Sequence, residues 1–161
     1  MGTNYSSAYA ICRTIDCAAS MARYLLLQKK ITITPEEAKK HIWIEFEGAM
    51  HLADVWINGK HVMQHAGGYT PFVVDATGLL KTGKENELLV RLDNRNNSLI
   101  PPGKPLETLD FCYYGGIYRN VHLIAKADVH ITHPIMANEV AGGGIFVTYP
   151  YVSKQEAEIK V

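Results

Sequence analysis

The chain has 161 residues, 47% of them hydrophobic, and its 16 basic side chains balance its 16 acidic ones at a formal net charge of zero. This hydrophobic fraction suffices for a full core, which excludes intrinsic disorder, and the lack of a basic stripe argues against a nucleic-acid partner. No apolar run is long enough to span a membrane as a helix. Residues 1–23 also lack the continuous apolar stretch of a signal peptide, and composition leaves the compartment open.

The cysteines and histidines do not form a metal-binding pattern. Cys12, Cys17 and Cys112 include no CxxC pair, and the seven histidines are scattered along the chain. A structural zinc site needs four suitably spaced ligands. We therefore predict no metal site, and no other pattern indicates a cofactor.

The first part of the chain predicts strands joined by short turns. Residues 1–22 have no clear period and predict an irregular lead-in, whereas residues 24–33 are rich in β-formers. Residues 35–38 predict a polar turn or a single helical turn. The clearest half-buried strand is residues 41–47, where apolar residues alternate with others. One face carries Ile42, Ile44 and Phe46, and the other carries His41, Trp43, Glu45 and Glu47.

A β-hairpin is predicted around Asn58-Gly59, because this dipeptide tolerates the two positive φ angles of a type I′ turn. Gly67-Gly68 then predicts a sharp turn. Pro71 predicts an edge strand or the entry of a strand, because proline cannot donate to a strand ladder. This density of turns is typical of an antiparallel β-sandwich. We expect its core to contain the alternating apolar residues Ile42, Ile44, Phe46, Val55, Ile57, Val90 and Leu92.

The next segments continue the alternation of strand and loop. Residues 75–80 predict a short helical turn capped by Asp75 or Thr77. Residues 88–92 alternate as a strand does, and residues 121–124 return to strand. Residues 94–104 predict a long loop punctuated by proline and glycine, the kind of segment in which binding groups usually lie.

A domain boundary is predicted near Lys126, which gives domains of residues 1–126 and 127–161. Beyond the boundary, three strand-like runs are separated by turn segments. Three strands cannot close a sandwich, so we expect these residues to begin a second β domain that is cut short. The runs are residues 129–132, 145–151 and 157–161.

Several segments, taken together, resemble the N-terminal sugar-binding domain of family 2 glycoside hydrolases, the group of β-galactosidases, β-glucuronidases and β-mannosidases. They follow the family's order over about residues 24–124, whereas residues 1–22 match poorly. The resemblance implies an all-β jelly-roll sandwich like a galactose-binding domain, followed by the first strands of an immunoglobulin-like sandwich. The matching segments are Phe46–Gly48, Ala53–Lys60, His65–Phe72, Asp75, Gly83, Glu85-Asn86, Val90–Asn94 and Gly115–Val121.

In this family a (β/α)8 barrel carries two catalytic glutamates, and these residues include no such barrel. The resemblance implies a non-catalytic domain that completes the active site of a β-galactosidase-like enzyme, and we expect this chain alone to be inactive. The implied partners are a carbohydrate, such as a β-galactoside or a related glycoside, and the remaining domains of the enzyme. A free-standing carbohydrate-binding module and a purely structural interaction sandwich stay open as alternatives.

Four carboxylates are candidate functional groups: Asp54, Asp75, Glu107 and Asp110. A helix cap accounts better for Asp75, and a strand or turn position for Asp54. In the β-galactosidases of the family, an aspartate at the place of Asp110 reaches the barrel mouth and contacts the sugar. The resemblance therefore implies that Asp110 binds substrate, from a partly exposed loop before Gly115-Gly116.

An aromatic cluster follows Asp110 in the sequence. The C–H face of a sugar ring binds well to an aromatic face, so Tyr113 and Tyr114 are candidate substrate-binding residues. Packing against the core or against the barrel is the alternative for the cluster, which also contains Phe111 and Tyr118. Arg119 is expected to form a structural ion pair or hydrogen bond.

Overall fold

The computed structural model describes residues 7–12, 24–105, 108–111, 113–140 and 142–161, the first of these ranges by its backbone alone. The chain divides into two compact units, residues 1–128 and 129–161. This division lies two residues after Lys126.

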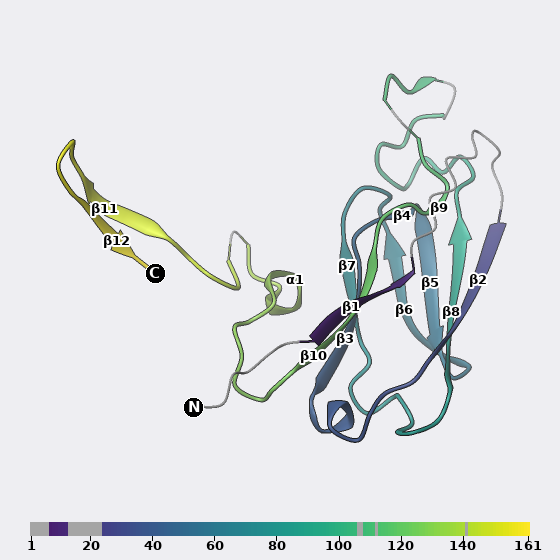
Figure 1. Cartoon of the computed structure of the whole chain (residues 1–161). Helices are drawn as coiled ribbons and strands as arrows, with labels where there is room; N and C mark the ends of the chain where they lie inside the picture. Colours follow the sequence, from purple (N-terminus) through teal and green to yellow (C-terminus); the bar gives the residue numbers. More distant parts are fainter. Residues whose placement is uncertain (1–6, 13–23, 106–107, 112, 141) are drawn as a thin grey trace. The chain divides into compact units, whose positions relative to one another are not determined.

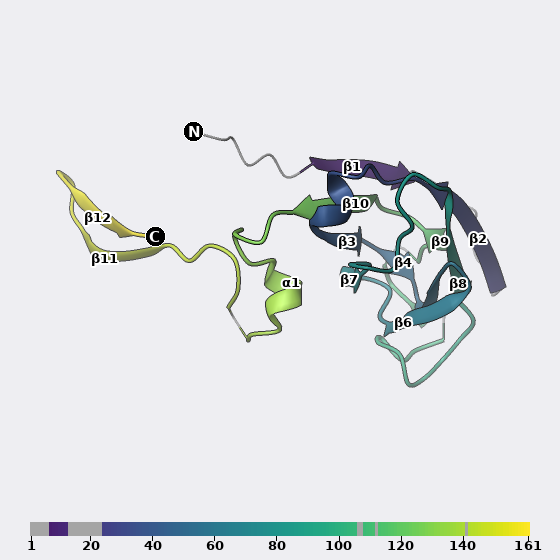
Figure 2. The ribbon, with the colours of Figure 1, turned by 90° about the horizontal axis from the view of Figure 1, so that it is seen from below.

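Within its described residues, the first unit is a sandwich of two four-stranded antiparallel sheets (Figures 1 and 2). The chain passes repeatedly between the two sheets, as in a jelly-roll. The predicted all-β jelly-roll sandwich is therefore confirmed. The first sheet has the order β1 (Ser7–Cys12), β10 (Val121–Lys126), β3 (His41–Phe46) and β7 (Phe72–Asp75). The second has the order β2 (Tyr24–Ile31), β8 (Asn86–Asp93), β5 (Leu52–Ile57) and β6 (Lys60–Ala66).

Two short elements complete the first unit. The strands β4 (Ala49–Met50) and β9 (Gly116–Ile117) pair with each other at one end of the sandwich (Figure 1). A single 3-10 turn, η1 (Glu37–Lys39), overlaps the segment predicted to form a polar or helical turn.

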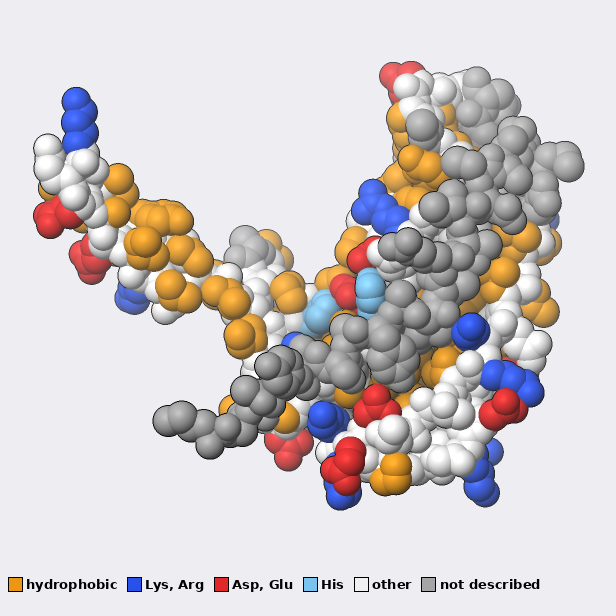
Figure 3. All heavy atoms as spheres, viewed as in Figure 1, with side chains coloured by type: hydrophobic (Ala, Val, Ile, Leu, Met, Phe, Trp, Pro, Cys, Tyr) orange, Lys and Arg blue, Asp and Glu red, His pale blue; other side chains and the backbone are white. Residues whose placement is uncertain are grey.

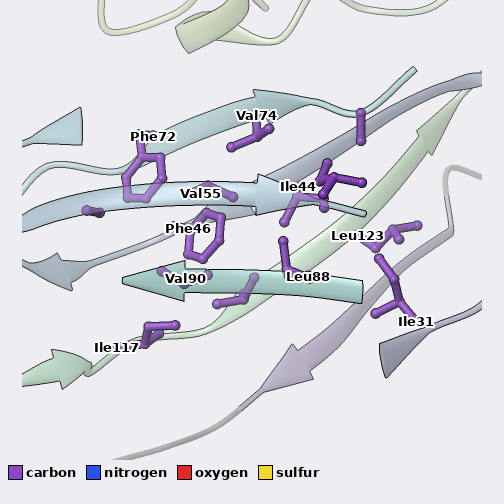
Figure 4. Close-up of a cluster of buried hydrophobic side chains, with 14 of the residues drawn as sticks. Ile31, Ile44, Phe46, Val55, Phe72, Val74, Leu88, Val90, Ile117 and Leu123 are labelled. Carbon is purple, nitrogen blue, oxygen red and sulfur yellow. The ribbon is translucent and has the colours of Figure 1, made fainter. Parts of the chain in front are cut away.

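The core lies between the two sheets, and Figure 4 shows side chains from both of them meeting there. All seven residues predicted for it are at most 2% exposed, which confirms the periodicity argument. Trp43 differs from expectation, because it lies on the opposite face of β3 and is nevertheless only 6% exposed. On that face of β3, His41 and Glu45 are half-buried, so Trp43 is the residue that departs from the predicted pattern.

The predicted hairpin joins β5 to β6. Asn58 and Gly59 have φ angles of 50° and 79°, as a type I′ turn requires. The Asn58 side chain also donates to the fully buried Asn86, with 2.9 Å between Nδ2 and Oδ1. The turn is thus fixed by tertiary hydrogen bonds as well as by local preference.

Asp54 lies on the outward face of β5, where three neighbours surround its carboxylate. Arg91 donates to Oδ2 from Nη2 at 2.7 Å, Gln64 donates to Oδ1 at 2.9 Å, and a ring nitrogen of His61 lies 3.1 Å from Oδ1. Burial alone would raise the pKa of Asp54, but these hydrogen bonds outweigh it and hold the pKa below its ordinary value of 3.8. The strand role expected for Asp54 agrees with this network.

Replacing Asp54 by asparagine should lower the free energy of unfolding by about 1–3 kcal/mol at pH 7, because charged hydrogen bonds are lost. Since the folded-state pKa lies below the unfolded one, the carboxylate stabilises the fold above about pH 4 and ceases to do so as the pH falls through the folded pKa. Urea unfolding at several pH values should therefore show the two proteins converging below about pH 4.

Asp128→Asn is the matched control, because that side chain is 91% exposed and its loss should change stability by about 0.5 kcal/mol or less. A deficit in Asp54→Asn that stays the same down to about pH 2 would contradict a role for the charge.

Two predictions for the first unit are wrong in part. Residues 7–12, placed in an irregular lead-in, form strand β1 along β10. Backbone hydrogen bonds to the edge of an existing sheet do not require apolar and polar residues to alternate. The sequence of residues 7–12 therefore did not indicate strand β1. Asp75 ends strand β7 and residues 77–79 form a turn rather than a helical turn, although Asp75 does accept a hydrogen bond from the Thr77 backbone N–H at 2.9 Å.

The second unit contains a short helix, α1 (Pro134–Ala137), and a hairpin of β11 (Thr148–Val152) and β12 (Ala157–Lys160). Two of the three predicted strand-like runs therefore overlap strands, residues 145–151 with β11 and residues 157–161 with β12, and the prediction for residues 129–132 is wrong. Val129 and Ile131 are exposed and have no adjacent strand among the described residues, and Pro134 then begins a helix.

The hairpin exposes apolar side chains, which gather along it in Figure 3. Its membership of an immunoglobulin-like sandwich stays a prediction. In the described part of the chain, no helix combines the length and the hydrophobicity needed to cross a membrane.

Candidate functional site

The candidate site is built from loops at the end of the sandwich where β4 and β9 pair (Figure 1). Residues 108–111 and 113–115, here called the Asp110 loop, precede β9. The loop of residues 66–71 packs closely beside β4, since a Cβ atom on Gly68 would overlap the Met50 sulfur. A Cβ on Gly48 would likewise lie 2.8 Å from the Tyr118 ring. Glycine at these two positions therefore permits the close packing that shapes this end.

Tyr113 fixes the Asp110 loop to the sandwich. Its hydroxyl oxygen lies 2.6 Å from the Asn94 carbonyl oxygen and 3.1 Å from Nδ1 of His51. The rings of Tyr113 and His51 also meet edge to face, with centroids 6.3 Å apart. His51 is only 5% exposed, so this anchor is an interior contact.

Both members of this pair are neutral at pH 7. Burial raises the pKa of Tyr113 to about 12, and the neighbouring acidic groups of Tyr69 and Asp93 add to the rise. Burial lowers the pKa of His51, against the opposing effects of the Asp93 carboxylate and the Arg95 backbone. The anchor is thus a hydrogen bond between uncharged groups and needs no compensating charge.

The other aromatic residues form separate pairs. Tyr114 stacks on Tyr118 with centroids 4.4 Å apart, and the Tyr118 hydroxyl donates to the Gly68 carbonyl at 2.7 Å. Phe111 meets Tyr69 edge to face at 5.6 Å and is 48% exposed. Each aromatic of the predicted cluster therefore has a packing partner, and Phe111 is also open to solvent.

Asp110 lies where it was expected, on an exposed loop before Gly115-Gly116. Within the described residues it forms no ion pair with Arg119. Neither the ion pair nor the hydrogen bond expected for Arg119 is seen among the described residues, and its guanidinium carbon instead lies 5.6 Å from the centroid of the Tyr118 ring. The Asp110 carboxylate is therefore available at the surface.

The remaining candidate carboxylates do not join Asp110. Asp54 is enclosed by its hydrogen-bond network, Asp75 caps a turn, and Glu107 lies outside the described residues. No cluster of three or more His, Cys, Asp or Glu side chains within the described ranges could hold a metal ion.

His51, Asn94 and Tyr69 contribute to this end of the sandwich and were not predicted. His51 meets Tyr113 across 62 positions of the sequence, and no spacing rule links two such residues. The sequence signal for this end of the sandwich was the two glycine pairs, Gly67-Gly68 and Gly115-Gly116, which indicate sharp turns. They did not identify the residues that contact the Asp110 loop.

Comparisons with known proteins agree with this architecture. The family model described as "Glycosyl hydrolases family 2, sugar binding domain" matches residues 4–127. The match extends into the lead-in, which seemed dissimilar from its sequence. A β-glucuronidase of Bacteroides fragilis is 35% identical over 154 residues, which are 93% of this chain and 20% of that protein. A β-galactosidase of Thermoanaerobacter pseudethanolicus is 45% identical over 93 residues, which are 57% and 12% of the two chains.

Among solved structures, β-glucuronidase 2 of Bacteroides uniformis, covalently bound to cyclophellitol-6-carboxylate aziridine, superposes with a TM-score of 0.71 at 30% identity. That match covers 86% of this chain and 16% of the enzyme. The chain thus spans a fifth or less of the length of these relatives. By its family match, its sequence relatives and its fold, the chain belongs to the sugar-binding domain family of family 2 glycosyl hydrolases.

Proposed function

We propose that this domain contributes Asp110 to glycoside binding in a family 2 glycoside hydrolase, and that the catalytic carboxylates belong to another part of that enzyme. The observation that carries the proposal is an exposed carboxylate on a loop whose neighbour, Tyr113, is anchored in the interior. An exposed carboxylate can accept hydrogen bonds from two vicinal sugar hydroxyls, and charge-assisted bonds are stronger than neutral ones.

The aromatic side chains next to Asp110 support a supplementary role. Tyr113 and Tyr114 both have interior partners, so we propose that they shape the loop and offer at most one edge to a sugar. Phe111, 48% exposed, is the better candidate for a contact with the C–H face of a ring.

For the glycoside itself we propose a β-galactoside. A β-glucuronide carries an additional carboxylate, which would need a cation beside it. Near this end, the Arg95 guanidinium is already paired with Asp93, and the exposed Arg119 lies over the Tyr118 ring. If the domain serves a glucuronidase, the charge of the glucuronide would have to be met by another part of the enzyme.

Titration of the isotopically labelled chain with methyl β-galactoside and methyl β-glucuronide tests the proposal by NMR. We expect the amide signals of the Asp110 loop to shift with galactoside, with a dissociation constant on the order of 1–10 mM, because only part of the site is present. Glycerol serves as the hydroxyl-bearing control. A larger response to the glucuronide would reject the galactoside assignment.

The same titration separates the two other functions. Submillimolar binding on a different surface would identify a free-standing carbohydrate-binding module. No response to either glycoside, in the loop or elsewhere, would favour a purely structural sandwich.

A further inference from the structure

The backbone of His51 is fixed on both sides. Its N–H donates to the Asp93 carbonyl at 3.3 Å, and its carbonyl accepts from the Gly67 N–H at 2.9 Å. These bonds join it to the end of β8 and to the loop of residues 66–71. The imidazole thus projects from a well-supported position, and it is buried.

The donor and the acceptor in each hydrogen bond of the Tyr113 hydroxyl can be assigned by counting the hydrogen atoms available. A phenol has one hydrogen to donate, and the 2.6 Å separation from the Asn94 carbonyl oxygen requires that hydrogen to lie between the two oxygens. The Tyr113 oxygen then accepts from Nδ1 of His51, 3.1 Å away, in competition with the Arg95 backbone, which also attracts a ring hydrogen of His51. A neutral imidazole with its hydrogen on Nδ1 leaves Nε2 unprotonated.

We infer that His51 is a positioning residue: as the neutral Nδ1–H tautomer, it holds Tyr113 against Asn94 and so holds the Asp110 loop. Tyr113 is three residues after Asp110, so the anchor limits the positions that the carboxylate can reach. The effect of this anchor on sugar binding rests on the proposed function. The tautomer of His51 and the anchoring of the loop are independent of that function.

The tautomer can be measured in the unmodified chain. Long-range ¹H–¹⁵N correlation spectra at neutral pH should show a pyrrole-type shift for Nδ1 of His51 and a pyridine-type shift for Nε2. The Nε2–H form usually predominates for a solvated histidine, so this result would be distinctive. The opposite assignment, or rapid averaging of the two nitrogens, would overturn the inference without requiring any variant to fold.

A double-mutant cycle tests the anchoring. His51→Leu should speed hydrogen exchange of the Asp110-loop amides by about tenfold, the effect expected for one lost hydrogen bond, and Tyr113→Phe by more, because it removes both bonds of the hydroxyl. The double variant should exchange no faster than Tyr113→Phe alone, because loss of the Tyr113 hydroxyl already removes the contact with His51 as well as the bond to Asn94. His51→Asn keeps a donor near the position of Nδ1 and should restore much of the protection.

His122→Leu is the matched control, since His122 pairs with Glu47 on the outward side of the other sheet. It should leave exchange of the Asp110 loop unchanged. Additive effects of the two main substitutions, or equal losses in His51→Leu and His51→Asn, would reject the positioning role.

These measurements use no sugar, so their failure is distinct from a failure of the proposed function. If both hold, galactoside binding should weaken in His51→Leu and recover in His51→Asn. Loss of binding without faster exchange in His51→Leu would contradict positioning as the cause.

Discussion

Replacing Phe46 by alanine should lower the free energy of unfolding by about 3–5 kcal/mol, the usual cost of removing a fully buried phenylalanine. Phe46 is 0% exposed and stacks on Phe72 with ring centroids 4.6 Å apart. Removal of the ring loses this stacking and leaves a cavity between the two sheets. Because domains of this size are stable by only about 5–15 kcal/mol, urea unfolding should show a large drop in the transition midpoint.

Phe111→Ala is the matched control, because it deletes the same atoms from a side chain that is 48% exposed. Its effect on the urea midpoint should be small. A comparable loss of stability in both variants would mean that core burial does not explain the effect at Phe46.

The core of the sandwich was predictable because it depends on local periodicity. Residues 42, 44 and 46 in β3, and 90 and 92 in β8, alternate along their strands, and this alternation determines which face is buried. The hairpin at Asn58-Gly59 was predictable for a related reason, since its positive φ angles follow from the residue types.

Pairing with distant strands was not predictable from a local pattern. Strand β1 follows the edge of β10, more than a hundred positions along the chain, and no alternation in residues 7–12 signals it. The opposite error occurred at residues 129–132, where β-forming residues have no adjacent strand among the described residues. A β-rich sequence becomes a strand only where backbone partners exist.

The candidate site likewise has one feature that was predictable from the sequence and one that was not. The exposed loop position of Asp110 followed from its place in a recognisable segment, before Gly115-Gly116. The anchor formed by His51 and Asn94 depends on contacts that only the fold creates. The resemblance thus indicated the candidate loop, whereas the contacts that hold this loop are seen only in the structure.

Replacing Asp110 by asparagine, in an enzyme that includes this domain, should lower kcat/KM for its glycoside by roughly 30- to 1000-fold, equivalent to about 2–4 kcal/mol. An amide retains the size of the carboxylate but loses the charge and one acceptor atom, so a pair of sugar hydroxyls is no longer matched. The urea midpoint should barely change, because Asp110 is exposed and fills no core space.

Asp128→Asn again provides the control, since that side chain is 91% exposed and belongs to no proposed binding surface. Steady-state kinetics should separate the two substitutions, with a large effect at position 110 and none at 128. Full activity in Asp110→Asn would contradict substrate binding by this carboxylate. Reduced activity together with an equally reduced urea midpoint would instead indicate a structural role, because a residue that contacts only the sugar leaves the unliganded fold unchanged.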